Sequence, residues 1–288
     1  MTLHEFMYEV VLRPKPLRVM TNAALRAACP SRKRLGSAWR TPNPNDPVVS
    51  GGAALGLYDR SGTAFFKKYC KPGMTFLDIG ANTGYFSAWA IGLMRGNGRI
   101  IAFEPDPEAR RYLELTRDAN GSSCMSVIPL AASDAEGVAQ LYKNEENRGD
   151  NRLWKSDHCS SPVNVQCAPV DNVLRSLGIG SVDLIKMDVQ GFEGHVLGGM
   201  KETLKCSPNL TLLTEFWPWG LTKAGTDPHE LLEILGNLEF SLFTLVKGGV
   251  LKPMNEDRRA FIESLEQRDC NIVGLRKADL IQSAMGTT

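Results

Sequence analysis

The residues of this sequence that are best arranged for chemistry are a glycine-rich turn at positions 80–84 and an acid, Glu104, about 20 positions further on. An apolar run at 76–79 precedes the turn, and a second apolar run at 100–103 precedes Glu104. Glycine lets the backbone turn sharply and lets a ligand approach it closely. An acid at the end of the second strand can accept hydrogen bonds from both hydroxyls of a ribose. The pattern therefore predicts a strand–turn–helix–strand unit that binds a nucleoside or nucleotide.

The turn differs from the fingerprint of dinucleotide-binding proteins. Asn82 stands where that fingerprint has its middle glycine, and Asp78 precedes the first glycine. A pyrophosphate needs the middle position bare. An aminoacyl-sulfonium ligand does not, because an acid such as Asp78 can help to hold its amino group and positive charge. The stretch from Asp78 to Gly84 resembles the first motif of class I S-adenosylmethionine (SAM) methyltransferases, and its Gly-Ala-Asn-x-Gly form is typical of the FkbM family.

A second stretch carries the same resemblance. The FkbM family has a Lys-x-Asp-x-Glu-Gly-x-Glu pattern, and the matching positions here hold Lys186, Asp188, Gln190, Gly191 and Glu193. Gln190 replaces a common acid, so a role that needs charge at this position is not carried over. The resemblance covers roughly residues 60–250 and implies SAM as the cofactor. It implies cofactor contacts from Asp78, Gly80, Ala81, Asn82, Gly84, Tyr85, Phe86, Glu104, Pro105, Asp134 and Asp188.

The order of apolar runs and helical segments predicts the fold that positions these residues. Strands alternate with helices along the chain, which favours an α/β fold with a mostly parallel sheet and helices on both faces. The resemblance implies a Rossmann-like class I methyltransferase fold with a seven-stranded sheet, an inserted β-hairpin and an N-terminal helical extension. Ligands of such sheets bind outside the carboxyl ends of the strands. We therefore expect the residues that end or follow predicted strands to meet in one crevice, namely Gly80, Glu104, Asp134, Asp188 and Glu215.

Three acids are candidates for the catalytic step. Methyl transfer from a sulfonium is an in-line displacement in which the cofactor's charge activates the methyl group, so the protein mainly positions the acceptor. A hydroxyl acceptor also needs a base near it. Asp188 and Glu215 end predicted strands at the expected site, and Glu193 and His195 lie shortly after Asp188. Two strand-end carboxylates are not a dedicated metal cage, so we expect no metal site.

Two further segments have open roles. Trp217, Pro218 and Trp219 directly follow Glu215, and they either line an acceptor pocket, where they would stack on a sugar or aromatic ring, or seal the rim of the domain. The polar stretch 144–155 is loop-like and is placed to close over the acceptor. The sequence alone does not decide between these readings.

The amino-acid composition indicates which broad class of protein this chain belongs to. The chain has 288 residues, 43% of them hydrophobic, which suits one α/β domain with an extension. A net charge of +1 gives no sign of a nucleic-acid partner, and the sequence lacks an apolar run of about 18 residues that would span a membrane. The seven cysteines form no Cys-x-x-Cys pair, which favours reduced thiols and a cytoplasmic location. The oligomeric state stays open.

The predicted organisation has three parts. Residues 1–58 form a basic, proline-rich extension that is either a lid, a docking arm or a partly ordered leader. Residues 59–281 form the methyltransferase domain, and residues 282–288 form a disordered tail.

The leading hypothesis is a SAM-dependent methyltransferase that O-methylates a hydroxyl of a small molecule, sugar or glycan. One alternative is a catalytically silent SAM-binding or scaffolding module. The other is an NAD(P)-dependent oxidoreductase, which the missing middle glycine and the absence of a Tyr-x-x-x-Lys pair disfavour.

Overall fold

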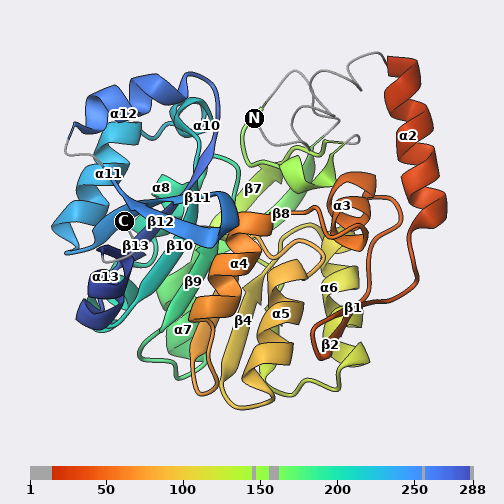
Figure 1. The fold of residues 1–288 in the computed structure, drawn as a ribbon, viewed down its shortest axis with the longest axis horizontal. Coiled ribbons are helices and arrows are strands. Elements are labelled where there is room, and N and C mark those ends of the chain that lie inside the picture. The colour runs from red at the N-terminus through yellow and green to blue at the C-terminus, as the bar shows by residue number, and fades with distance from the viewer. Residues whose placement is uncertain (1–14, 145–146, 156–161, 255–256, 286–288) are drawn as a thin grey trace.

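The protein is described by a computed structural model that covers residues 15–144, 147–155, 162–254 and 257–285. These residues form three layers, in which a large central sheet lies between two sets of helices (Figure 1). The order of strands in this sheet is β12-β11-β13-β10-β9-β3-β4-β5. Its strands are β3 (Thr75–Ile79), β4 (Arg99–Phe103), β5 (Met125–Ile128), β9 (Leu184–Met187), β10 (Thr211–Phe216), β11 (Ser241–Val246), β12 (Val250–Pro253) and β13 (Cys270–Leu275).

The direction of the strands divides the sheet into two parts. The five strands from β10 to β5 run parallel, so their carboxyl ends lie at one edge. β13 is antiparallel to both β10 and β11, and β12 is antiparallel to β11. The sheet among the described residues therefore has eight strands, whereas the sequence predicted seven. The additional strand is β12, a short edge strand that follows the turn at Gly248 and Gly249 and escaped the sequence reading because it has only four residues.

The two helical layers follow from the alternation of side chains along each strand. Phe76 and Ile100 point to one face, where they pack in a cluster with α4, α5 and α6. Leu77 and Ile101 point to the other face, where they pack with α7, α8, α9, α10 and α11. The helices of the first face are α4 (Arg60–Tyr69), α5 (Tyr85–Met94) and α6 (Pro107–Ala119). Those of the second face are α7 (Val170–Ser176), α8 (Glu193–Gly198), α9 (Lys201–Cys206), α10 (Pro218–Lys223) and α11 (Pro228–Asn237).

A small second sheet stands beside the carboxyl edge of the main one. β7 (Gly137–Leu141) and β8 (Val163–Pro169) form the predicted hairpin, and β6 (Ala131–Ser133) adds a parallel strand to β8. The short turn η3 (Arg148–Asp150) lies in the connection between β7 and β8. This insertion brings five residues between 148 and 153 to the same edge as the ends of β3, β4 and β9.

The N-terminal segment is integrated into the domain over much of its described length. It consists of α2 (Lys15–Ala28), the hairpin β1 (Lys33–Leu35) and β2 (Ala38–Arg40), the turn η2 (Pro47–Gly51) and α3 (Gly52–Ala54). Residues 1–14 of the predicted extension lie outside the described residues. α2 lies at the outer side of the molecule (Figure 1), whereas Arg40, Asp46, Val49 and Ala53 are almost completely buried.

The C-terminal segment contains a turn and two further helices, which are η4 (Lys247–Gly249), α12 (Arg258–Leu265) and α13 (Ala278–Met285). The first four residues of the tail expected to be disordered, 282–285, are instead the last turn of α13. Ala284 is buried against the sheet together with Leu275, which explains why the helix continues this far. Residues 286–288 lie outside the described part of the chain.

Candidate active site

A cavity opens at the carboxyl ends of β3, β4 and β9. The space between its lining residues measures about 690 Å³, a figure that includes open solvent at the mouth. Five of the residues predicted from the sequence line it, namely Gly80, Asn82, Glu104, Pro105 and Asp188. The strand-end rule therefore placed the cavity at the correct edge of the sheet.

The glycine turn adopts a backbone that ordinary residues avoid. Gly80 has φ +77°, and a Cβ at this position would lie 2.0 Å from the backbone oxygen of Asp188. Asn82 also has a positive φ of +50°, a conformation that asparagine tolerates better than most residues. The N–H groups of Gly80 and Ala81 both donate to the carbonyl oxygen of Phe103, at 3.1 and 3.0 Å. The turn is thereby held against the end of β4, beside Glu104.

Glu104 is buried at the end of β4, with 6% of its surface exposed. Its two carboxylate oxygens accept hydrogen bonds from the backbone N–H groups of Asn82, at 2.7 Å, and Asp106, at 2.8 Å. Burial raises the pKa of Glu104 to about 8, and the two N–H groups only partly oppose this effect. Each oxygen retains a lone pair for a further donor. The carboxylate is thus fixed in place and suited to a ligand that presents two hydroxyls.

A chain of polar contacts joins the ends of β9 and β10. Lys186 Nζ lies 2.9 Å from one oxygen of Asp188, and the amide nitrogen of Gln190 donates to the other oxygen at 2.8 Å. The same amide nitrogen donates to Glu215 at 3.0 Å. Both oxygens of Asp188 are therefore fixed by one donor each, and Asp188 also lines the cavity. Gln190, where the family commonly has an acid, links the two carboxylates.

The remaining predicted residues do not line the cavity. Asp78 is buried beneath the turn and accepts a 2.6 Å hydrogen bond from Ser87, and its pKa is raised by burial. Glu193 accepts from the N–H of Val189 at 3.1 Å, so it braces the turn that carries Gln190. Burial raises the pKa of Glu193 to about 7 and that of Glu215 well above its usual value. Ala81, Gly84, Tyr85 and Phe86 also lie outside the lining, and the last two pack in the core around α5.

Asp134 does not join the crevice, in contrast to the expectation from its place after a strand. Its side chain is half exposed and pairs with His195 Nδ1 at 3.1 Å. The strand before it, β6, belongs to the small sheet, so its end does not meet those of β3 and β4. Leu130, Ala131 and Ala132 line the cavity instead. The other ring nitrogen of His195 lies 3.0 Å from the carbonyl oxygen of Ala224, which gives this histidine a structural role.

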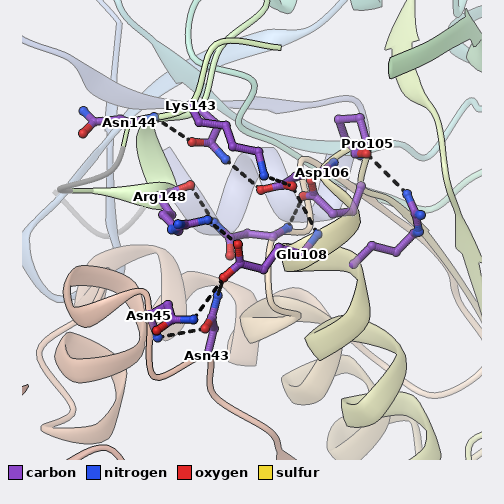
Figure 2. Close-up of polar contacts among 12 residues, drawn as sticks. Asn43, Asn45, Pro105, Asp106, Glu108, Lys143, Asn144 and Arg148 are labelled. Carbon is purple, nitrogen blue, oxygen red and sulfur yellow. Dashed lines mark hydrogen bonds and ion pairs between the residues drawn. The ribbon is translucent and has the colours of Figure 1, made fainter. Parts of the chain in front are cut away.

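Two segments that lie outside the two sequence motifs, the N-terminal segment and the insertion, cover the cavity. Tyr58 comes from the N-terminal segment, and Arg148, Gly149, Asn151, Arg152 and Leu153 come from the insertion. Figure 2 shows how carboxylates at the start of α6 hold these segments together. Glu108 accepts from Asn43 and Asn45 of the N-terminal segment and from Arg148 of the insertion. Asp106 binds Lys143 at 2.6 Å and Asn151 at 3.2 Å.

The sequence predicted only part of this cover. The polar stretch 144–155 was expected to close over an acceptor, and five of its residues line the cavity, namely Arg148, Gly149, Asn151, Arg152 and Leu153. Tyr58 was assigned to the extension, one position before the predicted domain boundary. Its partner is Tyr85, whose ring lies 4.9 Å away, and no local pattern connects two tyrosines 27 positions apart.

The described residues contain neither a metal-binding cluster nor a membrane-spanning helix. Among them, no group of three or more His, Cys, Asp or Glu side chains is arranged to hold a metal ion. No helix in the described ranges is both long and apolar enough to cross a membrane.

Comparisons with known proteins place the chain among methyltransferases. The model of the methyltransferase FkbM domain matches residues 78–242, more than half of the chain. The chain is similar to the 2-O-methyltransferase NoeI of Sinorhizobium fredii, with 28% identity over 185 residues, covering 59% of this chain and 74% of that enzyme. It is also similar to part of the antimetabolite synthetase AmbE of Pseudomonas aeruginosa, with 27% identity over 182 residues, 51% of this chain and 8% of the synthetase. A crystal structure of an FkbM methyltransferase from Methylobacillus flagellatus aligns with 94% of this chain and 60% of its own, at 13% identity and a TM-score of 0.43.

Proposed function

The chain belongs to the FkbM methyltransferase domain family and is a SAM-dependent methyltransferase, and from this premise we propose that it methylates a hydroxyl oxygen of a small molecule, sugar or glycan. The observation that carries the proposal is the fixed carboxylate of Asp188, which lines the same cavity as Glu104 and the glycine turn. The relative named a 2-O-methyltransferase supports oxygen as the accepting atom.

The residues of the cavity fit the cofactor. Glu104 is a desolvated acid with free lone pairs, and the two hydroxyls of a ribose would supply the donors that it lacks. Asn82 and Gly80 would shape the space beside the methionine part, with Asp78 acting from below the turn. Ala131 and Ala132 leave apolar surface near Pro105, which suits the flat base of a nucleoside.

The cofactor supplies a methyl group that its sulfonium charge already activates, so the protein must position the acceptor, exclude water and remove a proton. Asp188 is the base in this proposal. Lys186 and Gln190 hold its two oxygens and leave lone pairs to accept the hydroxyl proton of the acceptor. Burial raises the pKa of Glu215 well above its usual value, which favours the neutral form of this acid beside Asp188. The covering segments that contain Tyr58 and Leu153 would exclude water from the cavity.

The proposal is tested with radiolabelled SAM and a panel of sugars and small alcohols. For an acceptor that is turned over, Asp188→Asn should lower kcat by about 10²- to 10⁴-fold, the usual contribution of a general base. Its affinity for S-adenosylhomocysteine (SAH) should change little. Asp118→Asn is the matched control, because Asp118 is exposed on α6 and pairs only with the neighbouring Arg117. An Asp188→Asn variant with unchanged kcat would refute the assignment of the base.

The same panel addresses the silent-module alternative. A binding module would take up SAH and transfer no methyl group to any acceptor, whereas an enzyme should label at least one class. The small-molecule or glycan nature of the acceptor and a cytoplasmic location remain predictions from the sequence.

A further inference from the structure

Arg152 is a nearly buried cation that lines the cavity and is held from several sides. Only 6% of its surface is exposed. Its Nη2 pairs with the carboxylate of Asp150, and its Nε lies 3.4 Å from the carbonyl oxygen of the same residue. Its third nitrogen, Nη1, makes no hydrogen bond within the described part of the chain. A guanidinium that lines a cavity thus keeps one nitrogen, with two N–H groups, available.

Two indole rings pack against this guanidinium. Its carbon lies 4.5 Å from the centre of the Trp154 ring and 5.1 Å from that of Trp217. The rings are themselves held, because Trp154 donates to the carbonyl oxygen of Gln190 and Trp217 to that of Gln267, both at 2.8 Å. Arginine that is stacked on aromatic rings is oriented before a ligand arrives, so less entropy is lost when it binds a planar or tetrahedral oxyanion.

The place of Arg152 in the sheet separates it from the expected cofactor contacts. Glu104 ends β4, and the glycine turn follows β3. Trp217, against which Arg152 packs, follows β10, which lies on the far side of β9 from β3. Asp188 at the end of β9 stands between these two halves. Arg152 therefore lies on the side of the proposed base that is opposite to Glu104.

The other charged side chains of the cavity leave Arg152 able to bind an anionic ligand. The charged side chains that line it are Glu104, Arg148, Arg152 and Asp188. Arg148 is engaged by Glu108, and Asp188 is paired with Lys186. Arg152 is paired with Asp150 on one edge only, so an additional anion would meet the open nitrogen rather than a second carboxylate.

We infer that Arg152 forms an oxyanion subsite for the methyl acceptor, so that the acceptor is a hydroxyl compound that also carries a carboxylate or phosphate group. The inference rests on the proposed function, since it concerns the acceptor of the same site. The sequence left open whether Trp217 lines an acceptor pocket or seals the rim. In this proposal Trp217 serves the acceptor pocket indirectly, because it packs with Trp154 against Arg152 and orients it.

The test is a titration of the SAH-saturated protein with three probes, followed through the indole N–H signals of Trp154 and Trp217 in NMR spectra. D-glucuronate presents a carboxylate, D-glucose 6-phosphate presents a phosphate, and methyl glucoside presents hydroxyls alone. At least one acidic probe should shift both signals saturably, and methyl glucoside should not. The acidic probe that binds with the lower Kd shows whether the subsite prefers a carboxylate or a phosphate.

Variants assign the effect to Arg152. Arg152→Gln should raise the Kd of the acidic probe by about tenfold or more, since charge-assisted hydrogen bonds contribute about 1.5–3 kcal/mol. Arg152→Lys, which keeps the charge and loses the planar fork, should give an intermediate loss. SAH affinity, measured by calorimetry, should stay within about twofold in both variants, a change below about 0.5 kcal/mol. Arg175→Gln is the control, because Arg175 is exposed and pairs with Glu202 at the surface.

Four results would overturn the inference. They are a response to methyl glucoside as strong as that to the acids, no response to either acid, an acid response that survives Arg152→Gln, and a loss of SAH affinity in that variant. The last result would assign Arg152 to the carboxylate of the cofactor. If the acids bind as expected but no hydroxyl compound is methylated, the subsite stands and the proposed function fails, so the two failures are distinguishable.

Discussion

The two halves of the cavity wall are built in different ways. The strand-end half contains Gly80, Asn82, Glu104 and Asp188, which follow parallel strands of the sheet. The covering half contains Tyr58 of the N-terminal segment and five residues of the insertion, namely Arg148, Gly149, Asn151, Arg152 and Leu153. The first half is encoded in two short motifs, each within one turn of a strand. The second half depends on contacts between segments up to about 100 positions apart in the chain, which no local pattern specifies.

The largest loss of stability should follow a substitution of Gly80, because the turn at this position has no room for a side chain. In Gly80→Ala the new Cβ would collide with the backbone oxygen of Asp188, which cannot rotate away. We expect a loss of more than about 4 kcal/mol in the free energy of unfolding. Gly73→Ala is the matched control, because Gly73 has φ +88° and no atom within 4 Å of the Cβ position. That control should cost only about 1–2 kcal/mol. Equal losses in urea denaturation of the two variants would contradict the collision argument.

The N-terminal segment, which supplies Tyr58 to the covering half, is tested next at Arg40. This residue is completely buried and donates to Thr83 in the glycine turn at 2.5 Å. Arg40→Met removes the positive charge that opposes the buried carboxylate of Asp46. Breaking a direct buried ion pair typically costs about 3–5 kcal/mol. We expect less here, because the described residues show no hydrogen bond between Arg40 and Asp46 and the two groups interact through space. The double variant Arg40→Met/Asp46→Asn should recover most of the loss. Arg34→Met, an exposed change in the same hairpin, should have little effect, and a double variant no better than the single one would argue against the pair.

Buried acids near the strand ends should make the folded protein less stable as the pH rises. Burial raises the pKa of Glu104 to about 8 and of Glu193 to about 7, so the folded state binds more protons than the unfolded state above about pH 4.5. The stabilisation is therefore complete at low pH and is lost as the pH rises through these values. One such group changes the free energy of unfolding by at most about 1.4 kcal/mol per pH unit. Thermal melts of the SAH-free protein between pH 5 and 9 should show a decline that Glu104→Gln reduces. A Tm that rises over this range would contradict the assignment.

The smallest effect is expected at the contact that joins the covering segments. Glu108→Gln weakens the ion pair with Arg148, which is partly exposed and worth about 1 kcal/mol or less. SAH should dissociate up to about fivefold faster in stopped-flow measurements, while the free energy of unfolding stays nearly constant. Glu114→Gln on the same helix is the control, since Glu114 faces Arg110 at 3.9 Å near the surface. An unchanged dissociation rate would mean that the covering half does not retain the cofactor.

The contrast between the two halves explains which parts of the fold and of the site could be predicted from the sequence. The fold, the turn at Gly80 and the placement of Glu104 and Asp188 followed from strand patterns and from the spacing of two motifs. The prediction for Asp134 was wrong because the strand before it belongs to the small sheet. The spacing of residues along the chain does not show which distant strands pair. Tyr58 and Arg152 were missed as site residues because each becomes part of the cavity only through contacts with remote partners, Tyr85 for the first and Trp217 for the second.

The most direct test of the central claim, that the strand-end half holds SAM through Glu104, is calorimetric titration of the protein with SAH. Glu104→Ala removes the acceptor for two ribose hydroxyls, which should cost about 2–3 kcal/mol, or roughly 30- to 150-fold in Kd. Glu114→Ala, exposed on α6, should bind SAH like the unmodified protein. SAH affinity that is the same in Glu104→Ala as in the unmodified protein would contradict the account, because the cofactor would then lie elsewhere.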